Sequence, residues 1–252
     1  MEESLCQALD RKMRAKAHPE HPPGGAPGRR SCPPRLILMI RWMLEPGHTA
    51  AEFVSRHMMV TLVRGFLKEI RGEVEFDWDS PLETTFSGTI PMWSLYTGEP
   101  TRDDHLRSAD FFDVENYPEI TFDGRFTERM SDLEFGAETD LTIRGTTKTI
   151  PLDVVYSGQW ITPWWEGEVN RGEMRRIGFE ARGRVNRHDF GVSWQDEMSN
   201  GGVVVRDQID LFLDAEAVAV EDLERTGAID YYRQRSRGER PAAPASEWAK
   251  KT

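Results

Sequence analysis

Cysteine is almost absent from this chain of 252 residues, which contains only Cys6 and Cys32. Both precede residue 41, so no disulfide can cross-link a domain that folds from the remainder. A domain without disulfides is typical of a reducing compartment, and the sequence is therefore consistent with a cytoplasmic protein.

Long apolar runs are also missing. No stretch of about 18 apolar residues occurs, so we predict no transmembrane helix and no stable membrane insertion. Residues 36–40 resemble the start of a signal-peptide core, but Arg41 interrupts them and no small-residue cleavage site follows. We therefore expect retention in the cytoplasm. Met39 is an alternative start of translation, and the sequence leaves the choice open.

Positive charge is scarce after the first 41 residues. The whole chain has a net charge of −11. Residues 1–41 contain eight Lys/Arg and four Asp/Glu, a net of +4, which leaves −15 for the remainder. A body this acidic repels phosphate backbones, so we predict no nucleic-acid partner. For the same reason, docking to a membrane through a basic patch is disfavoured.

Helix-period segments are rare in the middle of the chain, where period-2 alternation dominates. Val74, Phe76 and Trp78 alternate with acidic residues, and the same alternation continues through residues 133–143, 152–156, 177–185 and 209–215, with Phe212 as an exception. Alternation sends one set of side chains to an apolar interior and the other to water. Such segments, separated by turn residues, predict an antiparallel sandwich or barrel.

One segment departs from this pattern. Thr101 is followed three residues later by Asp104, the spacing of a capping box. Leu106 comes next, and then the pair Phe111-Phe112. We predict a short helix between strands, which would act as a lid or plug beside a barrel.

The two ends of the chain differ from the middle in composition. Residues 1–40 are polar and include a Pro/Gly-rich run, so we expect a disordered extension. Residues 220–252 are charged and then Ala/Pro-rich, which predicts a short helix over residues 221–235 and then a tail. Residues 41–219 are expected to form one domain.

Four motifs in order carry a resemblance to a known family. They are WMLEPGHT (42–49) with EFVSRHMMV (52–60) and VRGF (63–66); RDDHLRSADFFDV (102–114) with YP (117–118) and ITF (120–122); LTIRGTTK (141–148); and NRHDFGV (186–192). In these residues the chain resembles the YceI-like family of polyisoprenoid-binding, lipocalin-like proteins.

The resemblance implies an all-β fold, an eight-stranded antiparallel lipocalin-like barrel around an elongated apolar cavity. It also suggests a homodimer. Such a barrel has room for one slim ligand, and each buried CH₂ contributes about 0.8 kcal/mol. We expect non-catalytic binding, transport or sequestration of a polyisoprenoid, a prenylated quinone or a fatty-acid derivative, with no cofactor. Residues 160–174, with Trp164-Trp165, look like an inserted loop.

Seven residues are candidate ligand contacts: His57, Arg64, Trp93, Leu106, Phe111, Phe112 and Trp194. Arg64, with His57 seven residues away, would neutralise a pyrophosphate or polarise a quinone carbonyl at the mouth. An ordinary rim charge is the alternative. The aromatic residues would line the cavity, and plain core packing is their alternative.

Metal binding and catalysis are competing interpretations. His48, His57, His105 and His188 show no metal-ligand spacing, so we expect no metal site. Ser108, His105 and Asp110 lie close in sequence, but no nucleophile elbow is present.

Two alternative functions remain open. The first is an enzyme acting on a lipid or quinone through His57 or His105 with Arg64. The second is an interaction module that docks a partner through the acidic body and Trp164-Trp165.

Overall fold

The computed structural model describes residues 39–196 and 203–236. The expected N-terminal extension before residue 39, both cysteines and the tail beyond residue 236 lie outside the described residues. The strands are β1 (Ile40–Leu44), β2 (Ala50–His57), β3 (Thr61–Leu67), β4 (Arg71–Phe76), β5 (Thr85–Pro91), β6 (Glu119–Arg129), β7 (Glu134–Ile143), β8 (Thr146–Glu166), β9 (Val169–Asn186) and β10 (Gln208–Ala219).

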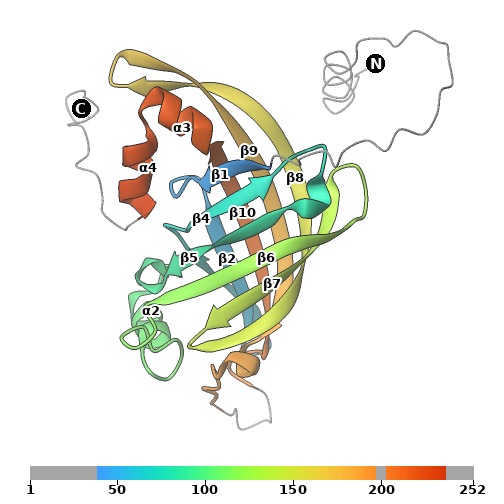
Figure 1. Cartoon of the computed structure of the whole chain (residues 1–252). Helices are drawn as coiled ribbons and strands as arrows, with labels where there is room; N and C mark the ends of the chain where they lie inside the picture. Colours follow the sequence, from blue (N-terminus) through green and yellow to red (C-terminus); the bar gives the residue numbers. More distant parts are fainter. Residues whose placement is uncertain (1–38, 197–202, 237–252) are drawn as a thin grey trace, which may run out of the picture. The chain divides into compact units, whose positions relative to one another are not determined.

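An antiparallel ring of strands closes the sheet into a barrel (Figure 1). The ring runs β1-β4-β5-β6-β7-β8-β9-β10, and the pairing of β10 with β1 completes it. The hairpin β2–β3 also pairs with β10, so that β1 and β2 lie end to end along this strand, with Trp42 opposite Ala219 and Phe53 opposite Leu211. The predicted eight-stranded antiparallel barrel is confirmed.

The alternation of side chains separates the interior of the barrel from its outer surface. On β7, Phe135, Ala137 and Leu141 are buried in the core, whereas Glu138 and Asp140 are exposed. Removing such apolar surface from water supplies the main driving force for this closure, at roughly 25 cal/mol per Å². A strand whose apolar residues alternate with polar ones can bury apolar surface on one face only, and the sequence pattern therefore predicts which side chains face inward.

An aromatic cluster fills one part of the interior. The ring of Phe76 stacks on Tyr156 with centroids 5.2 Å apart and meets Phe179 edge-on at 5.3 Å. Phe126 stacks on Phe135 at 5.0 Å. This cluster lies toward the β6–β7 turn, since Arg129 at the end of β6 reaches the Phe135 ring. We call it the aromatic plug.

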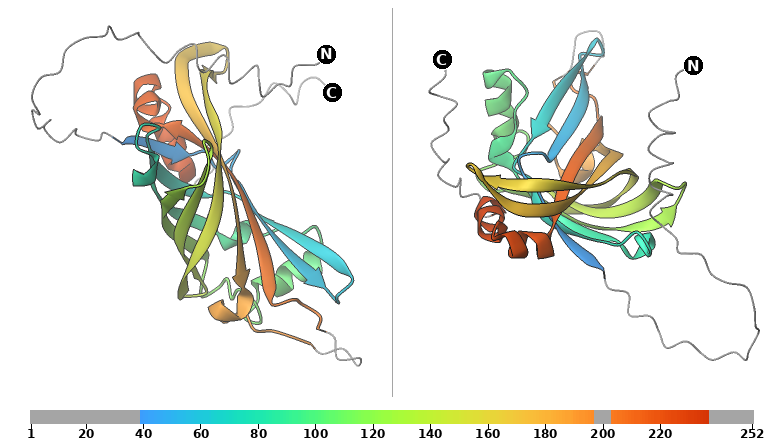
Figure 2. Two further views of the ribbon diagram at one scale, coloured as in Figure 1. Left: turned by 90° about the vertical axis from the view of Figure 1, so that its right-hand side faces the viewer. Right: turned by 90° about the horizontal axis from the view of Figure 1, so that it is seen from above.

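Two short helices, α3 (Val220–Thr226) and α4 (Ile229–Ser236), follow β10 and pack on the outside of the barrel (Figures 1 and 2). The single helix expected over residues 221–235 is therefore wrong, because Gly227 adopts a left-handed conformation (φ 76°) that ends α3. Asp222 holds α3 to β9 by accepting hydrogen bonds from the backbone N and Nε of Arg175, both at 2.8 Å.

The predicted inserted loop around Trp164-Trp165 is also wrong, since both residues belong to a long extension of β8 paired with β9. Trp164 packs on the rings of Tyr231 and Tyr232, at 5.6 and 6.2 Å, while Trp165 is exposed. The extension reaches past α3 (Figure 1).

The predicted helix between strands is α2 (Pro100–Arg107). Its N-cap is Glu99, whose carboxylate accepts from the backbone N of Thr101 and Arg102, so the expected cap at Thr101 is two residues too late. Arg107 fastens the helix to the barrel by donating to the carbonyl of Leu95 at 2.5 Å.

Candidate ligand-binding site

Two loops far apart in sequence meet at the end of the barrel opposite the aromatic plug. One follows α2 and the other follows the 3-10 helix η3 (Arg187–Phe190). His105 contacts the rings of Phe111 and Trp194, each at 5.0 Å, and these two rings lie 5.2 Å apart. We call this three-ring cluster the mouth.

Arg144 joins the two mouth loops. It lies in the turn between β7 and β8 and donates to the carbonyls of Ala109, Phe111 and Gly191 at 2.9, 2.9 and 3.0 Å. A guanidinium presents several donors in a fixed fork, so one side chain can satisfy three carbonyls at once. Both mouth loops are thereby held against the same strand turn.

A second arginine, Arg187, is almost fully buried behind the mouth, with 4% of its surface exposed. It donates to the carbonyls of Val192 and Trp194 at 2.9 and 2.7 Å and lies 3.4 Å from the carboxylate of Asp207. Burial lowers the pKa of Arg187, and Asp207 acts in the opposite direction. The arrangement fixes the Trp194 segment to the start of β10.

Between the mouth and the aromatic plug, inward-facing side chains pack on the core but keep part of their surface accessible. They are Phe53 of β2, Phe86 of β5, Phe122 of β6, Leu152 of β8, and Ile209, Leu211 and Leu213 of β10. Mid-strand residues facing the inside of a filled barrel would be buried, because native interiors are close-packed. Their partial exposure leaves apolar surface of these side chains accessible to a ligand.

Large side chains in this stretch lie along the wall, over inward-facing glycines of the next strand. A Cβ at Gly65 would come within 2.1 Å of the Phe53 ring, and a Cβ at Gly183 within 2.5 Å of Leu152. Gly124 carries the Phe86 ring in the same way, at 2.4 Å. Each glycine thus lets its neighbour lie flat rather than extend across the lumen.

Apolar side chains predominate at the inward-facing positions of this stretch. Two hydroxyls, those of Ser55 and Thr139, are buried without a hydrogen-bond partner among the described residues. The accessible inward-facing surface is therefore mainly apolar carbon, which suits a hydrocarbon chain.

Four of the seven predicted contacts come together. Phe111 and Trp194 form the mouth with His105, and Leu106 and Phe112 pack against the same core. The structure places these four side chains at the mouth end of the barrel. Ligand contact by them stays a prediction.

The other three predicted contacts lie elsewhere. Arg64 faces outward on β3 and pairs with Glu52 at 2.6 Å, and Trp93 is 52% exposed in the 3-10 helix η2 (Met92–Ser94). His57 ends β2 beside Val205, and strand alternation places it on the opposite face of the hairpin from Arg64. Phe53, Leu211 and Leu213 were not among the predicted contacts, although period-2 alternation on their strands indicates that they face inward.

Ser108, His105 and Asp110, which lie close in sequence, also lie close together in the structure. His105 Nε2 lies 3.0 Å from a carboxylate oxygen of Asp110. The Ser108 hydroxyl, however, donates to the backbone carbonyl of His105 at 2.8 Å. The hydroxyl is thus engaged at the end of α2, whereas a triad requires it at the imidazole.

One histidine does lie among carboxylates, in a cluster that sequence spacing could not reveal. Ligand atoms of Glu45, His48 and Glu216 lie within 4.8 Å of one another. Arg235 lies 3.5 Å from the Glu45 carboxylate, and Arg176 pairs with Glu216. These guanidiniums already neutralise both carboxylates, so the cluster forms an ion-pair network that joins the β1–β2 turn to β10 and α4.

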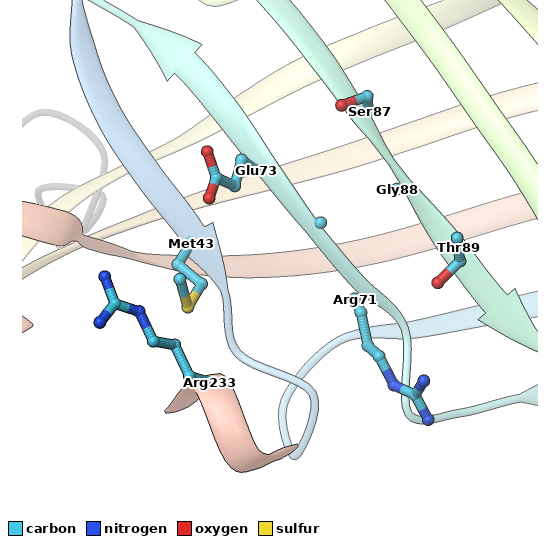
Figure 3. Close-up of a pocket in the computed structure, with 8 residues that line it drawn as sticks. Met43, Arg71, Glu73, Ser87, Gly88, Thr89 and Arg233 are labelled. Carbon is cyan, nitrogen blue, oxygen red and sulfur yellow. The ribbon is translucent and has the colours of Figure 1, made fainter. Parts of the chain in front are cut away.

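A groove of about 480 Å³ lies on the outside of the barrel (Figure 3). Its lining combines Met43 of β1, Arg71 and Glu73 of β4, and Arg233 of α4 with part of β5. Glu73 is paired with Arg41 at 2.8 Å. This charged groove is separate from the lumen and contributes no apolar channel.

A closed antiparallel barrel with an apolar interior and an aromatic mouth defines a lipocalin-like class of protein. Residues 42–217 match the family model of the YceI-like domain. The chain belongs to the YceI-like family.

Individual relatives agree with this assignment. The protein YceI of Escherichia coli O157:H7 is 32% identical over 148 residues, which cover 59% of this chain and 73% of the relative. The UPF0312 protein plu2095 of Photorhabdus laumondii is 33% identical over 146 residues, 58% of this chain and 71% of the relative.

Solved structures share the fold. The YceI protein of Campylobacter jejuni has a TM-score of 0.52 at 29% identity and covers 65% of this chain and 88% of its own. BcnA of Burkholderia cenocepacia has a TM-score of 0.55 at 19% identity, with 69% and 98% covered. The second likeness bears on the fold alone.

Proposed function

We propose that this protein binds one long apolar molecule inside the barrel and carries or sequesters it without changing it chemically. The observation that supports this most directly is the partial exposure of inward-facing Phe53, Leu211 and Leu213, in mid-barrel positions that a filled core would bury. The ligand class is a polyisoprenoid, a prenylated quinone or a fatty-acid derivative.

The energetics favour a chain-like ligand. Ten buried CH₂ groups at about 0.8 kcal/mol each supply roughly 8 kcal/mol, enough for a stable complex even after part is offset by lost freedom on binding. Wall-lying rings over Gly65 and Gly124 leave the lumen smooth and apolar, so affinity grows with chain length.

A non-catalytic role is supported by how the polar groups near the mouth are used. Arg144 and Arg187 donate to loop carbonyls, and Ser108 donates to the backbone. His105 with Asp110 is the pair to test for catalysis: His105→Ala is expected to leave ligand mass and identity unchanged after incubation. A new product formed by the wild-type protein and lost in this variant would contradict the proposal.

The ligand itself is tested by native mass spectrometry of the protein purified from its host, followed by solvent extraction and lipid analysis. We expect a co-purified apolar molecule in one-to-one ratio. Persistent absence of any adduct, even after incubation with prenyl alcohols and fatty acids, would refute the proposal. Action in the cytoplasm, and a homodimer, remain separate predictions, which fractionation and light scattering test.

A further inference from the structure

The tip of the β2–β3 hairpin presents large apolar side chains to solvent. Val60 is 81% exposed, Met59 59% and Met58 43%, and Leu62 on the adjoining strand is 47% exposed. We call these four residues the hairpin tip. Exposed apolar clusters of this kind mark surfaces that meet a partner or a lipid phase.

The backbone of the hairpin tip is strained to present these side chains. Met58 and Met59 both have positive φ, 48° and 63°, and the N of Val60 donates to the carbonyl of His57 at 3.0 Å. Positive φ at both central residues and this hydrogen bond are those of a type I′ turn, for which Asn-Gly is the favoured central pair. Two methionines at these positions are unfavourable for the turn, so the fold alone does not account for them.

Cationic side chains flank the hairpin tip. Arg56 and Arg206 line one hollow together with Met59. Within the ranges that the structure describes, neither guanidinium takes part in an ion pair or a side-chain hydrogen bond. The carboxylate that shares the hollow, Asp207, is engaged by His188 at 2.8 Å and by Arg187.

The hairpin tip lies at the mouth end of the barrel. The hollow beside it is also lined by Asn186 and Gln208, which stand at the end of β9 and the start of β10. The N of Met58 donates to the carbonyl of Val204, close to the segment that Arg187 anchors. The hairpin diverges from its neighbouring strands at this end (Figure 2).

We propose that the hairpin tip docks on an anionic lipid bilayer, with Met58, Met59 and Val60 in the headgroup–acyl boundary and Arg56 and Arg206 at the phosphates. The charge pattern selects this occupant. Arg56 and Arg206 flank an apolar apex without an ion-pair partner among the described residues, and this local arrangement complements an anionic surface. The inference rests on the proposed carrier function, since docking would bring the mouth close to membrane-dissolved ligand.

The decisive variant replaces the strained pair by the favoured turn sequence, Met58→Asn/Met59→Gly. It removes two of the four apolar side chains of the hairpin tip while relieving the backbone, so we expect no loss of fold stability with any loss of binding. The matched control is Met130→Asn, which removes a methionine of 49% exposure from the β6–β7 turn beside the aromatic plug. A second variant, Arg56→Gln/Arg206→Gln, removes charge and leaves the apex in place.

The assay is flotation of the full chain with vesicles of phosphatidylcholine, alone or mixed with phosphatidylglycerol. We expect the wild type and Met130→Asn to float with the anionic vesicles. The turn variant should bind the vesicles at least about tenfold more weakly than the wild type. The arginine variant should lose its preference for anionic lipid. Equal flotation of all four proteins, or none by the wild type, would overturn the docking.

Two further measurements separate this inference from the carrier function. Without vesicles, all four proteins should bind a soluble short-chain prenyl alcohol with the same affinity. If the wild type does not bind this alcohol, the proposed carrier function is refuted, even if the protein binds vesicles. Light scattering tests the competing occupant. A wild-type dimer that the turn variant converts to monomer would show that the hairpin tip meets a second copy, and the membrane proposal would be wrong.

Discussion

Filling the lumen from one wall position should abolish ligand binding without unfolding the protein. Leu211 lies on β10 opposite Phe53 and Gly183, and its side chain faces the accessible stretch of the interior. Leu211→Trp places a larger apolar group in that space. Adding volume to a filled core typically costs about 1–3 kcal/mol, so an open lumen predicts a change in unfolding free energy below about 1 kcal/mol.

The indole introduced by Leu211→Trp displaces part of the bound hydrocarbon chain, and the loss of affinity is estimated from the number of CH₂ groups displaced. Excluding about three CH₂ groups at about 0.8 kcal/mol each weakens binding by about 2.4 kcal/mol, or roughly 50-fold. The free energy of unfolding is measured by urea denaturation, and affinity by titration with a fluorescent prenyl ligand.

The control for this experiment is Ile177→Trp. Ile177 belongs to the same core but is 1% exposed, so the added volume has no space and should destabilise the barrel by about 1–3 kcal/mol. The reasoning is refuted if Leu211→Trp destabilises as much as the control while ligand affinity is unchanged.

Three other predictions concern single groups. Arg144→Met removes three hydrogen bonds to the mouth loops and should destabilise by roughly 1–3 kcal/mol while raising amide hydrogen exchange in residues 109–112; unchanged exchange would contradict the role of Arg144. Thr139→Val replaces an unpartnered buried hydroxyl by a methyl group and should raise the free energy of unfolding by about 1 kcal/mol, seen as a higher melting temperature. A lower melting temperature than that of the wild type would show that the hydroxyl has a hydrogen-bond partner. Burial raises the pKa of Tyr232 from 10.0 to about 12, so the folded state holds this proton more tightly than the unfolded chain does. The resulting stabilisation is fully present below pH 10 and is lost as the pH rises toward 12, by roughly 2–3 kcal/mol. In urea titrations over that pH range, the free energy of unfolding of Tyr232→Phe should fall less than that of the wild type.

The barrel was predictable because its information is local. Period-2 alternation in segments such as 133–143 fixes which side chains face inward, whatever the neighbouring strand is. The inward set containing Leu211 and Leu213 follows from the same rule. The sequence motif that holds Phe111 and Phe112 likewise placed a helix and aromatic residues where the mouth is found.

What the sequence left open depends on register between distant strands. Arg144 meets carbonyls 33 to 47 residues away, and no local pattern specifies that encounter. Glu45 and His48 meet Glu216 for the same reason. Arg64 appeared to be a mouth residue only because strand direction, and so its pairing with Glu52 on the outer face, was unknown.

The net charge of the chain does not predict where individual charged side chains lie on the folded surface. Net charge describes the average field of the body, and it disfavoured membrane docking through a basic patch. Local placement differs from this average at one end, where Arg56 and Arg206 come together beside Met59 although 150 residues separate them in the chain. The position of Trp164 is similar, since only the packing of α4 shows that its ring is covered.

The central claim is that an apolar chain lies in the lumen between the mouth and the aromatic plug. Intermolecular NOEs between a bound prenyl alcohol and labelled methyl groups of the protein test it most directly. We predict NOEs from the ligand chain to Leu211, Leu213 and Leu152. NOEs confined to outward-facing methyl groups such as those of Leu62 and Val60, or none at saturating ligand, would contradict it.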